Sequence, residues 1–427
     1  MKLLVVGAGA REHALSVALE AGGDSVVCAP GNPGIARDVR TIALDPNDPA
    51  AVLALAETQG ADLTVIGPEA PLAAGVADRF LAAGRLIFGP TLAAARIETS
   101  KAFAKGLMGR HGVPTAEARV CETLDDALDT LRSGVLGWPV VVKADGLAGG
   151  KGVVVAADAA EAEAAVRLSM VAGAFGAAGA RIVLEECLVG PELSYFAVAA
   201  GEHFVACGTA QDHKRLLDGD LGPNTGGMGA FSPSVLVDGG LCARIEREIV
   251  QPVLSGMAAE GTPFTGFLYC GLMLTSAGPK VIEFNCRFGD PEAQVVLPLL
   301  DEPLGPVLAR AASGQRLPTA LSFSRDVTAG VVLASGGYPG PLDTGHEIHG
   351  LDRVRAECPG VAVRCAGIAA RGAALVVSGG RVLTVVGRAA SYADAIAAAY
   401  DAVGRIHFRG MQYRTDIGAR ALTGSPG

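Results

Sequence analysis

Residues Lys280–Glu292 read KVIEFNCRFGDPE, an apolar-polar alternation that runs into a polar turn. The alternation predicts a strand, in which successive side chains point to opposite faces of a sheet. Glu283 and Asn285 then share one face, and Ile282 and Phe284 take the other, where they can anchor the strand in a core. A carboxylate and a carboxamide side by side offer only oxygen ligands, which suit Mg²⁺ better than a soft metal.

Arg287 follows this strand, where its guanidinium could bind an oxyanion through two parallel hydrogen bonds. The stretch therefore contains the elements of a site for a metal ion and an anionic substrate. Taken alone, the stretch fits a structural interpretation equally well. Glu283 and Asn285 would then be two polar side chains whose hydrogen bonds are made within the protein, at a strand end beside the turn at Gly289–Pro291. The rest of the chain has to decide between these two interpretations.

The strand at 280–285 is predicted to pair antiparallel with a strand at 267–275, inside a larger α/β block over residues 193–327. Two polar loops precede the pair, QDHKR at 211–215 and GPNTGGMG at 222–229. Long, glycine-rich loops are usually functional or disordered. Rigid prolines lie in and beside these loops, which favours a functional role.

Residues 123–192 read as a smaller α+β unit around a glycine-rich loop, DGLAGGKG at 145–152. The loop lies between two predicted strands and lacks the GxxxxGK[ST] pattern, so it is not a P-loop. Its physics is similar, because the backbone N–H groups of glycine can approach phosphates closely and lysines can neutralise their charge. The residues concerned are Gly149, Gly150, Gly152, Lys143 and Lys151. A plain glycine hairpin is the alternative, although it would not call for flanking lysines.

A helix is predicted over residues 100–111, and it places Lys101 and Lys105 four residues apart on one face. Such a pair is usually a solvated surface feature. Pro114 ends the helix. From the helix alone, exposed lysines are the favoured interpretation.

Residues 1–100 alternate apolar runs, glycine-rich turns and helices, which predicts a doubly wound parallel sheet. Ligands of such sheets bind at the carboxyl ends of the strands, where these turns lie. The turn GAGAREHA at 7–14 matches the dinucleotide-binding pattern only weakly, because Glu12 stands at its third glycine position. A glycine turn at a helix N-terminus still suits phosphate. We therefore interpret it as a phosphate site for something other than NAD.

Length and composition bound these interpretations. A chain of 427 residues is expected to hold roughly three domains. A formal net charge of −9 argues against a general nucleic-acid binder, and no apolar run approaches the roughly 20 residues of a membrane helix. The start MKLLVVGAGA imitates a weak signal peptide but is better explained as a buried first strand. Nine cysteines without a CxxC pair predict core residues in a reducing cytoplasm.

In combination, the motifs resemble the ATP-grasp superfamily and, within it, the phosphoribosylamine–glycine ligases, also called glycinamide ribonucleotide synthetases. The resemblance runs from residue 1 to about residue 420. The segments that carry it are AREHA at 10–14, GPEAPL at 67–72, SKAFAK at 100–105, KADGLAGGKGV at 143–153, QDHKR at 211–215, GPNTGGMGA at 222–230, EFNCRFGDPE at 283–292 and GGYPG at 336–340. Such a set in this order is highly specific.

The resemblance implies an α/β chain with an ATP-grasp fold. It implies an amino-terminal doubly wound parallel-sheet domain (1–122), a small α+β lid domain (123–192), a central ATP-grasp domain (193–327) and a carboxy-terminal β-rich cap domain (328–427), which we expect to carry no chemistry of its own. The implied reaction joins glycine to 5-phosphoribosylamine at the expense of ATP, through a glycyl phosphate, in de novo purine synthesis. The implied cofactor is Mg²⁺ or Mn²⁺. The implied state is a cytoplasmic monomer with no nucleic-acid or membrane partner.

Residue by residue, the resemblance implies three sets of roles. Glu283 and Asn285 would be metal ligands, and Arg287, Lys143 and Asp212 would be catalytic. ATP would be bound by Lys105, Lys143, Gly149, Gly150, Lys151, Gly152, Glu185, Glu186, Leu188 and Glu192. Substrates would be bound by Gly9, Ala10, Pro68, Glu69, Lys214, Asn224, Thr225, Gly226, Gly227, Met228 and Arg287. Arg287 would hold the glycine carboxylate or its acyl phosphate, and the amino-terminal turns would take the ribose phosphate.

Two departures from the family pattern and three rival functions stay open. Ala10 stands where a second adjacent glycine is expected, and Leu272–Leu274 are apolar where many ATP-grasp enzymes place a further acid. The rivals are another ATP-grasp ligase of purine synthesis, a nicotinamide dehydrogenase and a non-catalytic nucleotide sensor. The two polar loops count against the first and Glu12 against the second. An intact metal pair together with Arg287 counts against the third.

Overall fold

The computed structural model describes residues 1–148 and 152–423, and its amino-terminal part is a five-stranded parallel sheet in the order β3-β2-β1-β4-β5. The strands are β1 (Lys2–Gly7), β2 (Ser25–Pro30), β3 (Arg40–Thr41), β4 (Leu63–Ile66) and β5 (Ile87–Phe88). The helices are α1 (Ala10–Ala21), η1 (Ile35–Arg37), α2 (Pro49–Gln59), α3 (Glu69–Ala73), α4 (Val76–Ala82) and α5 (Leu92–Thr99). Alternate residues of β1 enter two different hydrophobic cores, so both faces of the sheet are covered. The predicted doubly wound sheet is confirmed.

The second unit is a four-stranded antiparallel sheet in the order β6-β9-β7-β8. Its strands are β6 (Ala118–Cys121), β7 (Val140–Ala144), β8 (Val153–Ala156) and β9 (Ile182–Glu186), and its helices are α7 (Leu124–Ser133), α8 (Ala159–Met170) and the short η2 (Gly176–Gly179). A compact aliphatic core joins the sheet to α7 and α8. Helix α6 (Lys101–Arg110) leads into it from the amino-terminal sheet. The α+β unit expected over residues 123–192 is present, and it also recruits β6 from before residue 123.

An eight-stranded sheet in the order β16-β15-β10-β11-β14-β17-β21-β18 forms the rest of the framework. Its strands are β10 (Glu192–Ala200), β11 (His203–Asp212), β14 (Gly229–Ser232), β15 (Thr265–Thr275), β16 (Gly278–Asn285), β17 (Val327–Ala334), β18 (Val361–Cys365) and β21 (Arg381–Ala389). Two hairpins stand apart from it, β12 (Arg215–Leu217) with β13 (Leu221–Asn224), and β19 (Ile368–Arg371) with β20 (Ala374–Val377). The sheet runs without a break from the predicted central domain into the predicted carboxy-terminal one.

The remaining helices cover this sheet and its loops. They are η3 (Asp218–Asp220), α9 (Gly239–Ile245), the π-helical turn η4 (Glu246–Val250), α10 (Gln251–Ala259), α11 (Glu292–Val296), η5 (Leu297–Leu299), α12 (Leu304–Ala312), α13 (Leu351–Glu357), α14 (Tyr392–Val403) and α15 (Ala419–Thr423). Among the described residues, none of the helices is both long and apolar enough to cross a membrane.

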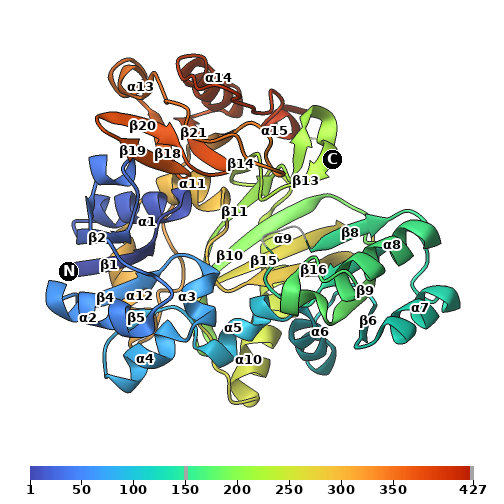
Figure 1. Ribbon diagram of the computed structural model, residues 1–427. Coiled ribbons are helices and arrows are strands. Elements are labelled where there is room, and N and C mark those ends of the chain that lie inside the picture. Colours follow the sequence, from blue (N-terminus) through green and yellow to red (C-terminus); the bar gives the residue numbers. More distant parts are fainter. Residues whose placement is uncertain (149–151, 424–427) are drawn as a thin grey trace.

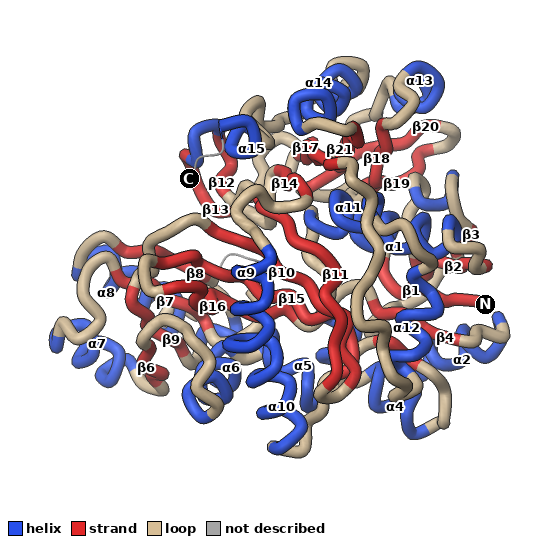
Figure 2. The backbone as a smooth tube through the Cα atoms, turned by 180° about the vertical axis from the view of Figure 1, so that it is seen from behind, coloured by secondary structure: helices blue, strands red, loops and turns tan. Residues whose placement is uncertain are grey.

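The strands β10, β15 and β16 lie at the centre of the molecule (Figure 1). The amino-terminal sheet, in blue, lies on one side of them and the small sheet, in green, on the other. The carboxy-terminal strands, in orange and red, lie above the amino-terminal sheet in the same view. Figure 2 shows the same arrangement from behind. The end of β16 therefore lies where the parts of the chain meet.

Strand β16 departs from strict alternation at Ile282. The residues of β15 that pair with Val281 and Glu283 are adjacent to each other, so Ile282 is an extra residue in a β-bulge. Val281 and Phe284 are buried in a core, whereas Ile282 lines the pocket described below. The expectation that Phe284 anchors the strand is confirmed, and the same expectation for Ile282 is wrong because the bulge turns it outward.

Candidate active site

A pocket of about 330 Å³ lies at the end of β16, where the amino-terminal, small and central sheets meet. Its described lining carries as many anionic as cationic side chains. The cations are Arg11, Lys101, Lys105, Lys143, Lys214, Arg287 and Arg381, and the anions are Glu69, Glu98, Glu185, Asp212, Glu283, Asp290 and Glu292. A pocket so rich in both charges suits polar, highly charged substrates rather than an apolar ligand.

The pocket contains many, but not all, of the residues that the sequence singled out. Those at its wall are Glu69, Lys105, Lys143, Gly152, Glu185, Asp212, Lys214, Thr225, Gly226, Glu283, Asn285 and Arg287. Those that lie outside its described lining are Gly9, Ala10, Pro68, Glu186, Leu188, Glu192, Asn224, Gly227 and Met228. Gly149, Gly150 and Lys151 lie outside the described residues of the chain.

Glu283 and Asn285 both line the pocket, as two residues on one face of a strand should. The Asn285 amide is assigned the orientation that satisfies both of its ends, in which its nitrogen donates to Glu98 Oε1 at 3.1 Å and to the Phe284 carbonyl at 3.0 Å. In this orientation the amide oxygen faces hydrogen-bond donors, as a metal ligand would face a cation. Among the described residues, no group of three or more His, Cys, Asp or Glu side chains could hold a metal. The pair fits a hard cation whose other ligands are substrate oxygens and water.

Arg287 is held between two carboxylates that come from the amino-terminal domain. Its Nη2 lies 3.0 Å from Glu98 Oε1, and its Nε lies 3.2 Å from Glu69 Oε2. Burial acts against the charged guanidinium, but Glu98 and Glu69 outweigh it and raise the pKa of Arg287. The guanidinium is therefore always charged and has a fixed orientation at the pocket wall.

Glu98 was not found from the sequence, yet it organises this end of β16. Besides Asn285 and Arg287, it binds Cys286, whose backbone N–H donates to Oε2 at 2.8 Å. Burial raises the pKa of the Glu98 carboxyl, and Arg287 opposes that effect. One carboxylate thus contacts three successive residues, of which the first and the last face the pocket.

Lys105 and Lys143 approach each other across a shared carboxylate. Glu185 Oε2 lies 3.1 Å from the Lys105 ammonium and 2.9 Å from that of Lys143. Lys143 also donates to the carbonyl of the bulged Ile282 at 3.1 Å. Burial lowers the pKa of Lys105 to about 8, against the effect of Glu185. The side chain of Glu185 therefore serves to position the two lysines.

Lys101 lies at the same pocket, and its Nζ donates to the Gly146 carbonyl at 3.1 Å. Burial lowers the pKa of Lys101 as well. The expectation of exposed, solvated lysines at this helix is wrong for both Lys101 and Lys105. The helix is covered by the small sheet, which the sequence of the helix alone does not reveal.

Asp145 fastens the start of the glycine-rich loop to the start of α6. Its Oδ1 accepts from the Ala102 N–H at 2.9 Å and from the Ser100 hydroxyl at 3.1 Å. Its Oδ2 accepts from Arg181 Nε at 2.6 Å. These contacts place Gly146 and the residues just after it at the pocket wall.

Asp212 and Lys214 form a second charged group on the central sheet. Lys214 Nζ lies 3.0 Å from Glu192 Oε2 and 3.5 Å from Asp212 Oδ2. Burial raises the pKa of Asp212 to about 7, although Lys214 opposes the rise. A carboxyl that titrates near neutrality at a pocket wall is suited to proton transfer.

The first glycine turn is already occupied by a side chain of the protein. Glu12 Oε2 accepts from the Gly9 N–H at 2.6 Å, and Glu12 Oε1 lies 3.3 Å from Arg11 Nη1. A Cβ at Gly7 or Gly67 would lie within 2.4 Å of the Glu12 side chain. The glycines of both turns thus make room for Glu12, which a dinucleotide-binding turn would not contain.

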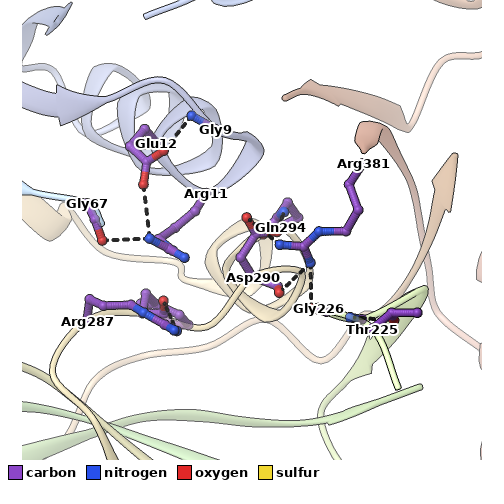
Figure 3. Close-up of polar contacts among 12 residues, drawn as sticks. Gly9, Arg11, Glu12, Gly67, Thr225, Gly226, Arg287, Asp290, Gln294 and Arg381 are labelled. Atoms are coloured by element: carbon purple, nitrogen blue, oxygen red, sulfur yellow. Dashed lines mark hydrogen bonds and ion pairs between the residues drawn. The ribbon is translucent and has the colours of Figure 1, made fainter. Parts of the chain in front are cut away.

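Arg11 and Arg381 are the cations that the sequence analysis missed (Figure 3). Arg11 donates to the Gly67 carbonyl at 2.9 Å. Arg381, at the start of β21, donates to the carbonyls of Asp290 at 2.7 Å and Gly226 at 2.6 Å, and its Nη2 lies 3.2 Å from Asp290 Oδ2. The expectation that the carboxy-terminal region contributes no chemistry is wrong, because Arg381 lines the pocket.

Asp290 connects these two arginines electrostatically. Burial alone would raise the pKa of Asp290, but Arg381 and Arg11 hold it below its ordinary value. Gln294 Nε2 donates to Asp290 Oδ1 at 2.7 Å, which fixes the carboxylate. The pocket therefore has a cationic end at Arg11 and Arg381 in addition to the group around β16.

The amino-acid sequence of the chain is similar to those of known proteins. Three family models match, described as the N, ATP-grasp (A) and C domains of phosphoribosylglycinamide synthetase, at residues 1–98, 99–293 and 328–420. A phosphoribosylamine–glycine ligase of Ralstonia nicotianae is 48% identical over 426 residues and covers 99% of this chain and 100% of its own. One of Xanthomonas axonopodis pv. citri is 51% identical over 361 residues, with 83% of each chain covered.

Solved structures are similar to this chain as well. The phosphoribosylamine–glycine ligase of Thermotoga maritima superimposes with a TM-score of 0.85 at 32% identity, covering 97% of this chain and 100% of its own. A biotin carboxylase of Campylobacter jejuni superimposes with a TM-score of 0.71 at 16% identity, covering 96% of this chain and 92% of its own. The second likeness shows a shared fold and no more.

Proposed function

The chain belongs to the phosphoribosylamine–glycine ligase family, and from that premise we propose that the pocket at the end of β16 is its active site. The protein is an ATP-dependent ligase that joins glycine to phosphoribosylamine in purine biosynthesis. The observation that best supports this location is that functional side chains from distant parts of the chain meet there. Buried lysines, two oxygen ligands and three arginines from distant parts of the chain line one cavity.

The first half-reaction makes the glycine carboxylate reactive. A carboxylate is a poor electrophile, so one of its oxygens attacks the γ-phosphorus of ATP, and the bond to the ADP oxygen breaks. The products are glycyl phosphate and ADP, and no nucleophile of the protein is needed. Lys105 and Lys143 would neutralise the nucleotide phosphates, and Glu185 holds both ammonium groups in place.

A divalent cation is implied by the fold, and Glu283 and Asn285 would hold it. When bound, it would supply charge neutralisation at the transferring phosphoryl group. Mg²⁺ or Mn²⁺ fits the oxygen-only donor set. With the Asn285 amide nitrogen assigned toward Glu98, the amide oxygen would be the ligand atom.

The second half-reaction forms the amide. The amine nitrogen of phosphoribosylamine attacks the acyl carbon, the bond to the phosphate oxygen breaks, and inorganic phosphate leaves. Arg287 would hold the glycine carboxylate and then the acyl phosphate, which needs a permanent charge of fixed orientation. The amine must also lose a proton, and Asp212, with a pKa raised to about 7 by burial, is suited to accept it.

The phosphate of phosphoribosylamine would lie at the cationic end formed by Arg11 and Arg381. Both arginines line the pocket, whereas the Gly9 N–H of the predicted phosphate turn is engaged by Glu12. Glu69, Lys214, Thr225 and Gly226 would line the path of the substrate between this end and β16. The other predicted positions, from the adenine linker at Glu186 and Leu188 to the ribose contact at Glu192, remain predictions.

The remaining parts of the proposal concern the oligomeric state and the cellular compartment. We expect a monomer in the cytoplasm that acts on its three small substrates without a nucleic-acid or membrane partner. All nine cysteines lie among the described residues and are free thiols, which suits a reducing compartment.

Release of ADP tests the proposal. Purified protein receives ATP and Mg²⁺, and glycine and freshly made phosphoribosylamine are added singly and together. Sustained release of ADP is expected only when both are present, because the amine must consume glycyl phosphate before the next turnover. Release of ADP without glycine would contradict the order of the half-reactions. A normal rate in an Arg287→Met variant would contradict the location of the active site.

A further inference from the structure

A second pocket, of about 350 Å³, lies on another part of the molecule and shares no lining residue with the active-site pocket. One wall is η1 with Asp38, from the amino-terminal domain, and the other is α13 with the edge strand β18, from the carboxy-terminal region. Three arginines line this pocket, Arg37, Arg355 and Arg364. Three guanidinium groups around one cavity are the feature to be explained.

Arg364 is the most informative of the three. Its side chain makes no hydrogen bond or ion pair with any described residue, and its Nε is buried without a partner although the residue as a whole is only half-buried. A polar nitrogen that loses its contact with water destabilises a folded protein unless a protein partner replaces that water, and no such partner is present at the Arg364 Nε.

The other charges at the pocket do not balance Arg364. Arg37 is paired with Asp352 and Arg355 with Asp38, through very short contacts. Asp38 is engaged a second time, by His13 Nε2 at 2.9 Å. Each carboxylate therefore already has a cationic or hydrogen-bonding partner, and Asp38 acts on Arg364 only at longer range. The three arginines outnumber the two carboxylates by one.

The two walls of the pocket are fixed relative to each other. Asn32 Nδ2 donates to the Cys365 carbonyl at 3.0 Å and to the Ala366 carbonyl at 3.2 Å. The Cys365 N–H donates in turn to His13 Nδ1 at 2.9 Å. These contacts join the amino-terminal sheet to the end of β18 directly beside the arginines. The backbone that carries Arg364 is thus held in place before a ligand binds.

We propose that this pocket binds a small phosphate-type oxyanion, with Arg364 as its principal contact and Arg37 and Arg355 as flanking cations. The planar guanidinium fork matches the oxygens of a phosphate. The cavity is larger than inorganic phosphate alone, so the class of ligand is a small phosphorylated molecule, of which inorganic phosphate is the minimal probe. The site is separate from the ligase reaction, and its failure would leave the proposed active site untouched.

Thermal unfolding of the full chain tests the proposal. The active site is first saturated with Mg²⁺ and ADP, and phosphate is then titrated at constant ionic strength against chloride. Phosphate is expected to raise the Tm of the wild type by roughly 1–3 °C. The Arg364→Gln variant is expected to lose most of this shift. The matched control is Arg353→Gln, on the same wall but outside the pocket, which should keep it.

The same experiment tests whether the unpartnered side chain of Arg364 lowers the stability of the protein. Without phosphate, Arg364→Gln should be at least as stable as the wild type, because it removes the unpartnered Nε and breaks no side-chain hydrogen bond or ion pair with the described residues. Crystals soaked with tungstate, a phosphate analogue with strong anomalous scattering, should show a peak within hydrogen-bond distance of Arg364. An equal phosphate shift in Arg364→Gln and wild type, or no tungstate peak in the pocket, would overturn the proposal.

Discussion

The Glu98 carboxylate accepts a 2.8 Å hydrogen bond from the backbone N–H of Cys286, and this contact fixes the end of the catalytic strand to the amino-terminal domain. Glu98 lies on α5, at the boundary of the parallel sheet, whereas Cys286 lies just beyond β16. The residues on either side of Cys286 bind the same carboxylate through their side chains. The proposed metal ligand Asn285 and the proposed substrate-binding Arg287 therefore share one support.

Glu98→Gln is expected to weaken the active site without abolishing the fold. The amide can still accept one hydrogen bond, but it cannot hold the Cys286 N–H, Asn285 and Arg287 together as a carboxylate does. Loss of such outer contacts typically costs ~10–100-fold in metal affinity or activity. The measurement is the Mg²⁺ concentration needed for half-maximal ADP release. Glu57→Gln, on the exposed face of α2, is the control and should match the wild type.

Glu283→Gln tests the metal assignment itself. The substitution keeps the shape of the side chain but removes the negative charge that would bind the cation. We expect kcat/KM to fall at least ~100-fold and the Tm to stay close to that of the wild type, because the side chain faces the pocket and not a core. Calorimetric titration of Mg²⁺ with ADP present should show weaker binding. Near-normal turnover would remove Glu283 from the metal site.

The parts of the fold that sequence analysis predicted correctly are those set by local patterns. The alternation of apolar strands, glycine turns and helices over residues 1–100 depends on neighbours in the chain, and the parallel sheet follows from it. Alternation also placed Glu283 and Asn285 on one face. It failed at Ile282, because a bulge inserts one residue, and nothing in the local sequence marks it.

The residues that sequence analysis missed act through contacts between distant segments. Glu98 and Cys286 are 188 positions apart, Arg11 and Gly67 are 56 apart, and Arg381 and Gly226 are 155 apart. Each missed residue looks ordinary in its own segment. A pattern within one element cannot indicate such a contact, because the partner is selected by the packing of whole sheets.

Arg381→Met tests the cationic end of the pocket. The KM for phosphoribosylamine should rise ~10–100-fold, since charge-assisted hydrogen bonds are worth about 1.5–3 kcal/mol. The kcat and the KM for ATP should change little, because the residue lies away from β16. Initial rates at varied phosphoribosylamine give both constants. Arg371→Met, at an exposed end of β19, is the control. A fall in kcat alone would assign Arg381 to the chemistry instead of substrate binding.

Lys105 should make nucleotide use sensitive to alkaline pH. Burial lowers its pKa to about 8 in the free enzyme, so the ammonium is charged below that pH and loses its proton above it. The kcat/KM for ATP, which reports groups of the free enzyme, is therefore expected to decline as pH rises through about 8. Lys105→Arg keeps its charge at every accessible pH, so its profile should be flat in this range even if its rate is lower. Lys101→Arg is the matched comparison, since burial lowers the pKa of Lys101 too. If the pH profile of kcat/KM became flat in Lys101→Arg and still declined in Lys105→Arg, the titrating group would be Lys101 and not Lys105.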